Sequence, residues 1–229
     1  VTGPALMGLH IPYDSLKDFT PIGLATYVPY CLFINGKLPP NSVKEFIAFA
    51  KSYPGKLNYS SPGVGTPNHL GGAQLVTMTG INLLHVPYKM GAQSMADLLA
   101  GVLPSIFSTP SDALTYVQAK KLRALATTGA SRHESLPDVP TVAESGFADF
   151  EALNWYAFAA PPKAKPEQVK RLNAAINEVL KDPAILAQLT KMGMKSAPGT
   201  PEQLAQYARR ESDKWGGVIR QANIRASVR

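Results

Sequence analysis

Short apolar segments alternate with helical patterns in the middle of the chain, and this alternation restricts the fold more than any other feature. Strands are expected at residues 81–88 (INLLHVPY, read as a buried strand), 102–107 and 122–128, and helices at residues 68–79, 93–99 and 112–119. Strands separated by helices typically form a parallel, doubly wound sheet. The pattern therefore predicts an α/β protein whose ligand binds beyond the carboxyl ends of the strands.

Two longer extended runs flank this region. Residues 19–35, FTPIGLATYVPYCLFIN, exceed an ordinary strand of about 5–6 residues and are interrupted at Pro29, so they predict two strands in sequence. Residues 152–159, ALNWYAFA, are again extended and apolar and predict a return strand beside the first run. The two runs indicate passages of the chain between two domains. Helical patterns at residues 166–180, 184–192 and 201–215 follow.

The stretch Asn58–His69, NYSSPGVGTPNH, predicts the end of a strand, a tight turn and the start of a helix. Thr66 is a good N-cap, and Pro67 suits the first helical position, where its missing N–H costs nothing. Glycine lets the backbone approach a guest closely, and the N–H groups and dipole of a helix start favour an anion. We therefore expect an anion cradle formed by backbone amides together with Ser60, Ser61, Gly63, Gly65 and Thr66.

A plain structural role is the alternative for this stretch, since any strand-to-helix connection can carry Gly, Ser and Thr. The spacing of Gly63 and Gly65 fits neither the dinucleotide fingerprint nor the phosphate-binding P-loop. Two further turns, at residues 88–91 and 108–111, also follow expected strands. All three turns can therefore converge on one mouth at the edge of the sheet.

The net charge of +7 does not indicate a nucleic-acid site. Residues 160–229 carry 13 Lys and Arg against 6 Asp and Glu, whereas residues 1–159 are balanced. The excess falls on amphipathic helices, so solvated helix faces explain it, and we expect weak, salt-sensitive DNA binding at most. Residues 1–4 show no signal-peptide pattern, and no apolar run reaches the roughly 20 residues of a membrane-spanning helix.

The candidate catalytic residues form no convincing set. Cys31 is the single cysteine and lies in an apolar segment, which indicates a buried, unreactive thiol. The four histidines share no metal-ligand spacing, so neither a metal nor a cofactor is expected. His85 reads as a packed strand residue and His69 as a capping or packing residue, while Asp97, Asp112 and Glu144 read as solvated surface carboxylates.

Seven segments, in the same order along the chain, are similar to those of one known family. They are DFTP at 18–21, PGKLNYSSPG at 54–63, GT at 65–66, HVPYK at 85–89, DLLAG at 97–101, KLRALA at 121–126 and LPDVPTVAESG at 136–146. On these segments the chain resembles the solute receptors of tripartite tricarboxylate transporters, the TctC-like, Bug-type periplasmic binding proteins. The resemblance covers nearly the whole chain.

The resemblance implies a two-domain periplasmic-binding-protein (Venus-flytrap) fold, with doubly wound sheets joined by two crossing strands. The first domain would comprise residues 1–30 and 156–229, and the second residues 31–155. The receptor would capture a small carboxylate or amino-acid-like ligand in an interdomain cleft in the periplasm and deliver it to the membrane components of the transporter.

The family's ligand contacts carry over to named positions of this sequence. The cradle residues given above would hold the carboxylate from the second domain, Ser108, Thr109 and Pro110 would form a second contact loop, and Tyr27 and Trp155 would be wall residues. The resemblance implies a receptor and not an enzyme. An enzyme acting on a small anionic substrate in the same cleft is the alternative, and a pure interaction module is a third class.

The sequence also departs from the family pattern. Family members begin with a strand and a glycine-rich loop that have no counterpart here, so we expect part of the first domain to be missing, with weaker binding and self-association as results. Met90 stands where glycine is expected, and Ser108–Pro110 replaces the more usual Asp-Asn turn. The resemblance therefore does not identify the carboxylate.

Overall fold

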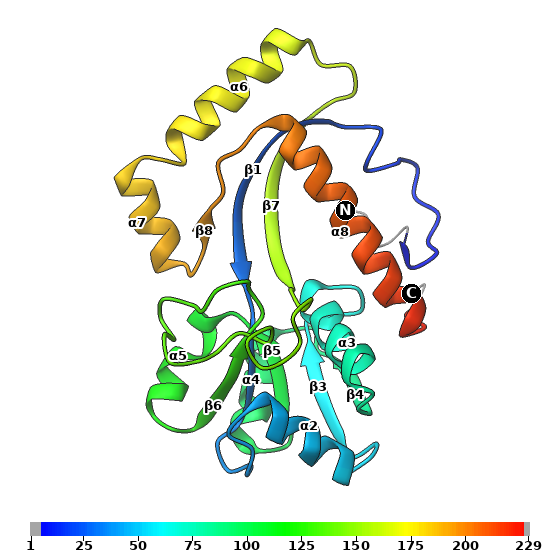
Figure 1. The fold of residues 1–229 in the computed structure, drawn as a ribbon, viewed down its shortest axis with the longest axis vertical. Coiled ribbons are helices and arrows are strands. Elements are labelled where there is room, and N and C mark those ends of the chain that lie inside the picture. The colour runs from blue at the N-terminus through cyan, green and yellow to red at the C-terminus, as the bar shows by residue number, and fades with distance from the viewer. Residues whose placement is uncertain (1–5, 227–229) are drawn as a thin grey trace. The chain divides into compact units, whose positions relative to one another are not determined.

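The computed structural model describes residues 6–226 and divides the chain into two compact units (Figure 1). Unit 1 contains the chain up to Val28 together with Asn154–Gly217, and unit 2 contains Pro29–Leu153 together with the residues from Val218 onward. The chain leaves unit 1 at the end of β1 (Thr20–Pro29) and returns at the start of β7 (Leu153–Ala160). The domain boundaries expected from the sequence stay a prediction.

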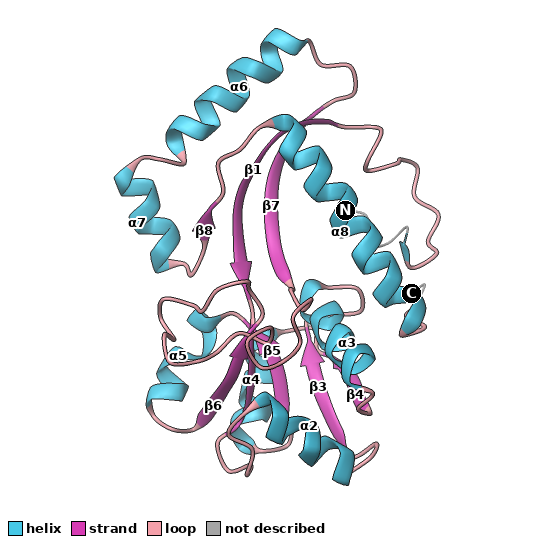
Figure 2. Ribbon diagram, viewed as in Figure 1, coloured by secondary structure: helices cyan, strands magenta, loops and turns pink. Residues whose placement is uncertain are grey.

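Unit 2 is built on a five-stranded sheet (Figure 2) with the strand order β4-β3-β5-β2-β6. Its strands are β2 (Cys31–Asn35), β3 (Leu57–Ser61), β4 (Leu83–Pro87), β5 (Ser105–Ser108) and β6 (Leu122–Thr127). β3 pairs in parallel with β4 and β5, as predicted, but β2 is antiparallel to both of its neighbours. The parallel sheet expected from the strands that alternate with helices is thus confirmed for β3, β4 and β5, and β2, which follows β1 directly, joins this sheet as an antiparallel strand.

The antiparallel direction of β2 has a consequence for the edge of the sheet. Cys31, the first residue of β2, lies opposite Ser108 at the end of β5 and opposite Thr127 at the end of β6. On the other side of β5, β3 ends at Ser61 opposite Pro87, the last residue of β4. The turns after β3, β4 and β5 therefore leave the sheet at one edge.

Four helices accompany this sheet, and local sequence signals explain where they begin. They are α2 (Val43–Ser52), α3 (Pro67–Thr79), α4 (Gly91–Ala100) and α5 (Pro110–Gln118). Ser42 caps α2 by accepting the N–H of Glu45, and Thr66 caps α3, as predicted, by accepting the N–H of His69. α3 ends at Gly80, whose φ of 66° is in the left-handed region that favours glycine.

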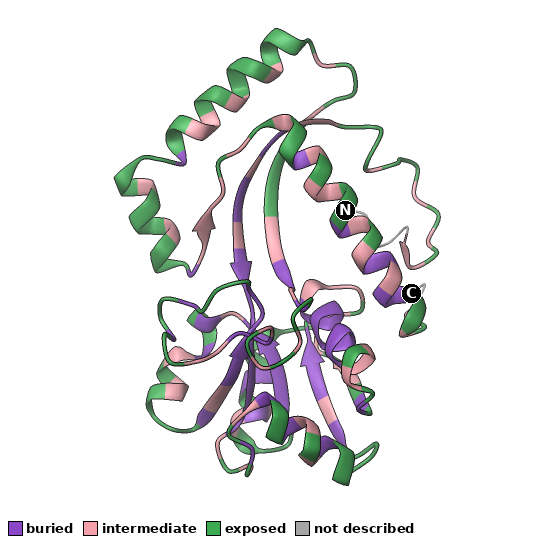
Figure 3. Cartoon of the chain, in the orientation of Figure 1, coloured by how far each residue is buried: buried purple, intermediate pink, exposed green. Residues whose placement is uncertain are grey.

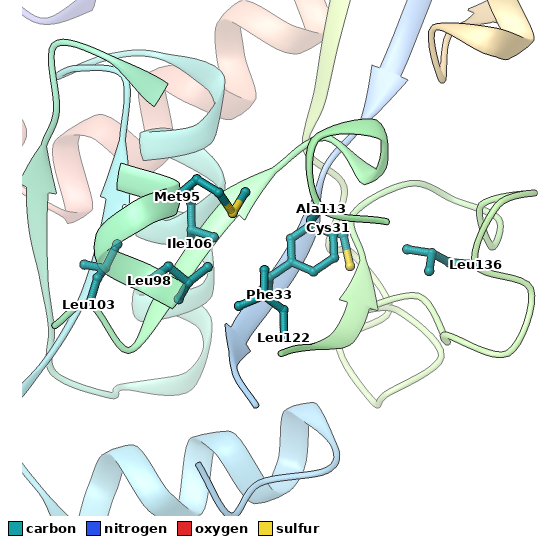
Figure 4. Close-up of a cluster of buried hydrophobic side chains, with 9 residues drawn as sticks. All are labelled: Cys31, Phe33, Met95, Leu98, Leu103, Ile106, Ala113, Leu122 and Leu136. Atoms are coloured by element: carbon teal, nitrogen blue, oxygen red, sulfur yellow. The ribbon is translucent and has the colours of Figure 1, made fainter. Parts of the chain in front are cut away.

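The core of unit 2 is formed by the central strands and by α4 and α5. Every residue of β2 is buried (Figure 3), and Cys31 and Phe33 pack in a cluster with residues of α4, β5 and β6 (Figure 4). Burial raises the pKa of the Cys31 thiol, so this cysteine is an inert core residue, as predicted. Residues 81–88 were expected to be a buried strand, which is wrong: β4 is shorter, lies at the edge of the sheet and leaves Leu84 62% exposed.

Unit 1 has a small sheet of order β7-β1-β8 and three helices. The remaining elements are β8 (Lys195–Ser196), α6 (Pro166–Val179), α7 (Pro183–Lys191) and α8 (Pro201–Gln221). Two side chains attach α6 to its neighbours, since Asn173 donates to the carbonyls of Ile22 and Gly199, and Asn177 donates to Gly199 as well. Neither α6 nor α7 contains a buried residue. Within the described residues, no helix is both long enough and apolar enough to cross a membrane.

Two helical glycines give a matched test of the packing around β3. A Cβ on Gly72 of α3 would lie 2.1 Å from the buried ring of Tyr59, whereas a Cβ on Gly217 of α8 would meet nothing within 4 Å. We expect Gly72→Ala to lower the free energy of unfolding by about 1–3 kcal/mol through overpacking. Gly217→Ala should raise it by up to about 1 kcal/mol through helix propensity. Urea unfolding of both variants measures the difference, and a Gly72→Ala variant as stable as the parent would contradict the packing.

We expect the chain to self-associate through the exposed edge of strand β7. Within the described residues it is an edge of its sheet and carries exposed aromatic side chains at Tyr156 (47%) and Phe158 (52%). Long apolar edge strands pair with other chains, and a lysine on such an edge opposes this. Phe158→Lys should therefore reduce the associated fraction in light scattering, whereas Val102→Lys, at a loop residue that is 71% exposed, should not. Equal effects of the two substitutions would exclude β7 as the contact.

Candidate functional site

A pocket of about 520 Å³ opens at the edge of the unit 2 sheet where the three turns meet. It is lined by Ser61 and Pro62 after β3, by Tyr88 and Gly91 after β4, and by Ser108 and Thr109 after β5. The predicted convergence of the three turns is thus confirmed. Met95, Ile106 and Phe107 give the pocket an apolar wall.

The turn between β3 and α3 is held together by its own hydrogen bonds. The Gly63 N–H donates to Ser61 Oγ over 3.1 Å, and the hydroxyl of Thr66 donates to the Gly63 carbonyl over 2.7 Å. The Gly65 N–H donates to His69 Nδ1 over 3.0 Å, and the φ of Gly65, 77°, is one that other residues rarely adopt. Glycine is therefore needed at position 65 for the shape of the turn itself.

This internal bonding changes which groups can meet a guest. The amides of Gly63 and Gly65, expected to face an anion, are already used inside the turn. Within the described residues, the N–H groups of Val64 and Asn68 make no hydrogen bond, and Asn68 also lines the pocket. Asn68 Nδ2 donates to the Phe107 carbonyl over 2.7 Å, which fixes this side chain between α3 and β5.

Two stacked histidines support the turn from below. The rings of His69 and His85 lie 3.7 Å apart at 17°, and the ring of Tyr59 lies 5.2 Å from that of His85. Burial, together with the neighbouring His85, lowers the pKa of His69 to about 3, and burial lowers the pKa of His85 to about 4. Both rings are therefore neutral at physiological pH. His69 Nδ1 accepts the Gly65 N–H, so its proton is on Nε2.

Ser61 connects the histidine pair to the pocket. Its Oγ lies 2.6 Å from His85 Nε2 and 2.9 Å from the Gly63 carbonyl, to which it donates. The Ser61 hydroxyl has a single proton, which it donates to the Gly63 carbonyl. In its contact with His85, Ser61 Oγ is therefore the acceptor, and His85 Nε2–H is the donor. The packing roles expected for His69 and His85 are confirmed by these contacts.

The turn between β5 and α5 is organised by a carboxylate. Asp112 Oδ2 accepts hydrogen bonds from Ser108 Oγ over 2.8 Å and from Thr109 Oγ1 over 2.6 Å, and Asp112 lines the pocket. Tyr88 donates its hydroxyl proton to Asp97 over 2.7 Å, which raises the pKa of Tyr88. Both carboxylates were expected to be plain solvated surface groups. Asp112 is indeed exposed, but each of them holds a hydroxyl group of the pocket.

Of the ten residues predicted to contact a ligand, some line the pocket and others do not. Ser61, Ser108 and Thr109 line the pocket. Ser60 is fully buried and lies 3.0 Å from the Ser94 hydroxyl, Oγ to Oγ. The other unit 2 residues of the set shape the two turns without lining the pocket: Gly63, Gly65, Thr66 and Pro110.

Two predicted residues belong to unit 1. Tyr27 lies in β1 opposite Lys195, and Trp155 packs edge-on against Tyr207 with ring centroids 5.5 Å apart. Their role as wall residues stays a prediction, as does ligand contact for the whole set.

Several lining residues were not predicted. Tyr88 and Asn68 follow directly from the rule that ligands bind beyond strand ends, since both flank the predicted turns. Met95 and Tyr116 come from within helices, and no local sequence signal marks them. Within residues 6–226, no group of three or more His, Cys, Asp or Glu side chains is placed to hold a metal ion.

A family model described as the tripartite tricarboxylate transporter family receptor matches residues 3–224 of this chain. The chain belongs to this family. A UPF0065 protein in the tcbD-tcbE intergenic region of Pseudomonas sp. (strain P51) is 35% identical over 218 residues, which cover 95% of this chain and 65% of the relative. The chain thus spans about two thirds of the length of this curated relative.

Solved structures give the same fold. The structure of R. palustris Rpa4515 with adipate has a TM-score of 0.80 and 30% identity, and the match covers 94% of this chain and 72% of that one. The structure of the periplasmic binding protein BugD has a TM-score of 0.79 and 28% identity, covering 99% and 77%. The predicted α/β fold of the periplasmic binding proteins and the predicted family are both confirmed.

The histidine pair of this receptor-family chain predicts a loss of stability in mild acid. An unfolded histidine takes up a proton near pH 6.5, whereas the folded His85 and His69 stay neutral down to pH values of about 4 and 3. The unfolded state therefore binds more protons as the pH falls below 6.5, and the folded state loses stability until the folded pKa values are reached. Between pH 6.5 and 4.5, the free energy of unfolding should therefore fall less in His85→Gln than in the parent. After allowance for solvent screening, we expect the difference to be roughly 1–2 kcal/mol.

Chemical unfolding at a series of pH values measures this effect. The exposed His10 provides the control, because His10→Gln removes a histidine outside the pair. Parallel curves for the parent and His85→Gln would show that the buried pair does not resist protonation.

Proposed function

We propose that this chain is the ligand-binding part of an extracytoplasmic solute receptor, which binds a small carboxylate at the edge of the unit 2 sheet. The observation that carries the proposal is the pocket of about 520 Å³ at the meeting point of three strand-to-helix turns, in a chain of a receptor family. The structure of one relative, R. palustris Rpa4515, was solved with adipate, which is a small carboxylate. The ligand would then be handed to the membrane components of a tripartite tricarboxylate transporter.

The chemistry of the β3–α3 side of the pocket supports a carboxylate. The backbone amides of Val64 and Asn68 make no hydrogen bond within the described residues, and both belong to the turn at the start of α3. Amides at a helix start carry the positive end of the helix dipole and bind anions without a lysine or arginine. The apolar wall formed by Met95, Ile106 and Phe107 suits the hydrocarbon part of such a ligand.

A periplasmic location is proposed on the same basis. BugD, which shares the fold, is described as a periplasmic binding protein. A binding protein that releases its ligand unchanged needs hydrogen bonds and shape, but no nucleophile or base. We accordingly propose that the protein is not an enzyme and uses no cofactor.

An enzyme remains the second candidate because of one contact. Ser61 Oγ lies 2.6 Å from His85 Nε2, which is the distance of a nucleophile from its base. Two features oppose this function: Ser61 is only 1% exposed, and burial keeps the pKa of His85 near 4, too low for an effective base at neutral pH. Turnover of small activated esters by the parent, lost in Ser61→Ala, would favour the enzyme.

Two glycines that flank α3 allow a matched test of carboxylate binding. Gly65 (φ 77°) precedes the helix beside the pocket, and Gly80 (φ 66°) ends it. Valine at either position is strained by a similar backbone conformation, so both variants should lose comparable stability. Only Gly65→Val should also weaken carboxylate binding, by about 10-fold or more, because it displaces the turn that carries the proposed amides.

Calorimetry with a panel of mono-, di- and tricarboxylates measures the affinities after both variants have been shown to fold. Equal affinities for Gly65→Val and the parent would show that the β3–α3 turn does not take part in carboxylate binding. No binding by any carboxylate would overturn the proposed function.

A further inference from the structure

Three hydroxyl groups of the pocket, at the ends of β4 and β5, have no proton left for a ligand. Ser108 and Thr109 both donate to Asp112 Oδ2, and Tyr88 donates to Asp97. Each hydroxyl has a single proton and keeps only lone pairs for a further partner. These three hydroxyl groups therefore offer a ligand hydrogen-bond acceptors and no donors.

The one charged group among the described residues of the pocket is negative, so it repels an anion just as these oxygen lone pairs do. Asp112 is the one charged side chain among the described residues that line it, and neither lysine nor arginine belongs to the lining. Asp112 Oδ2 accepts two hydroxyl protons, which is the behaviour of an ionised carboxylate. A second ligand carboxylate on this side would meet a like charge and three oxygen atoms that cannot donate.

The β3–α3 side of the pocket favours an anion, as argued for the proposed function. The amides of Val64 and Asn68 make no hydrogen bond within the described residues, and Asn68 lines the pocket. A ligand that fits both ends has a carboxylate at one end and a cationic or hydrogen-bond-donating group at the other.

We propose that Asp112 selects an amino carboxylate over a plain dicarboxylate, by accepting the ligand's ammonium group at the β5–α5 turn. This inference rests on the proposed function, since it assigns the second end of a ligand whose carboxylate is held by the β3–α3 turn. Ser108 and Thr109 act as positioning residues that hold the Asp112 carboxylate at the pocket and complete the ammonium's acceptors with their lone pairs.

Matched ligand pairs test the selection on the full chain. γ-Aminobutyrate and glutarate share a carboxylate and three methylene groups, and δ-aminovalerate and adipate share a carboxylate and four, so each pair differs only in an ammonium against a second carboxylate. We expect the amino carboxylate of at least one pair to bind about 10-fold or more tightly than its dicarboxylate partner. Calorimetry at constant ionic strength provides the affinities.

The variant Asp112→Asn removes the charge while keeping the size of the side chain and an oxygen atom for Ser108 and Thr109. It should abolish the preference, by weakening amino-carboxylate binding and strengthening dicarboxylate binding. The control is Glu45→Gln, which removes another first-turn acid from a helix of the same unit, outside the pocket lining. Melting temperatures report whether each variant folds.

The outcomes separate this inference from the proposed function. A preference for the amino carboxylate that Asp112→Asn removes and Glu45→Gln keeps supports the selection. Dicarboxylates that bind the parent as tightly as their partners, with no change in Asp112→Asn, overturn the selection and leave the carboxylate receptor intact. Absence of binding by both members of every pair, and by the carboxylate panel, overturns both.

Discussion

The hydrogen bond from the Tyr59 hydroxyl to the His69 carbonyl, 3.0 Å long, ties β3 to the first turn of α3. Tyr59 is 2% exposed, and its ring packs against His85 of the neighbouring strand and edge-on against Phe107 of β5. One side chain thus links three adjacent strands to the helix whose start forms the pocket. The close approach of α3 to this ring is possible because position 72 is glycine, with no Cβ to occupy the same space.

The turn above this contact is rigid because its polar groups are already paired. His69 fixes the Gly65 amide, Ser61 fixes the Gly63 amide, and the low pKa values of the stacked histidines keep both rings uncharged. A neutral support is required here, since a buried imidazolium without a carboxylate partner would be costly. The same pairing leaves few groups for a guest, so the proposed ligand would be recognised through a small number of fixed donors and acceptors, which is the basis of preorganised binding.

Much of this architecture could be predicted from local sequence signals. Thr66 as a helix cap, Pro67 at the first helical position and the break between two strands at Pro29 each depend on a few neighbouring residues, and each was correctly predicted. The direction of β2 and the exposure of β4 could not be, because they depend on which strands become neighbours. INLLHVPY is apolar enough for a buried strand, yet its place at the sheet edge leaves Leu84 in water.

At the site, too, the sequence does not show which hydroxyl protons are free to bind a ligand. The family resemblance implied that Ser108 and Thr109, two hydroxyl-bearing residues near a strand end, contact the ligand. Only the three-dimensional contact with Asp112, three and four residues further along, shows that both protons are already committed. A sequence pattern gives the type of group at a site. Whether a hydroxyl there can donate a hydrogen bond to a ligand, or can only accept one, depends on whether a neighbouring residue already accepts its proton.

Charge at the pocket and charge of the chain are separate properties. The surplus of basic residues lies in residues 160–229, whereas the described pocket residues carry the single charge of Asp112. At physiological ionic strength the field of exposed charges is largely screened beyond about 8 Å, so the net charge of the whole chain does not determine the charge that a ligand would meet inside the pocket. The proposed selectivity would therefore arise from short-range hydrogen bonds and from one carboxylate, and a change of salt should alter it far less than the loss of that carboxylate.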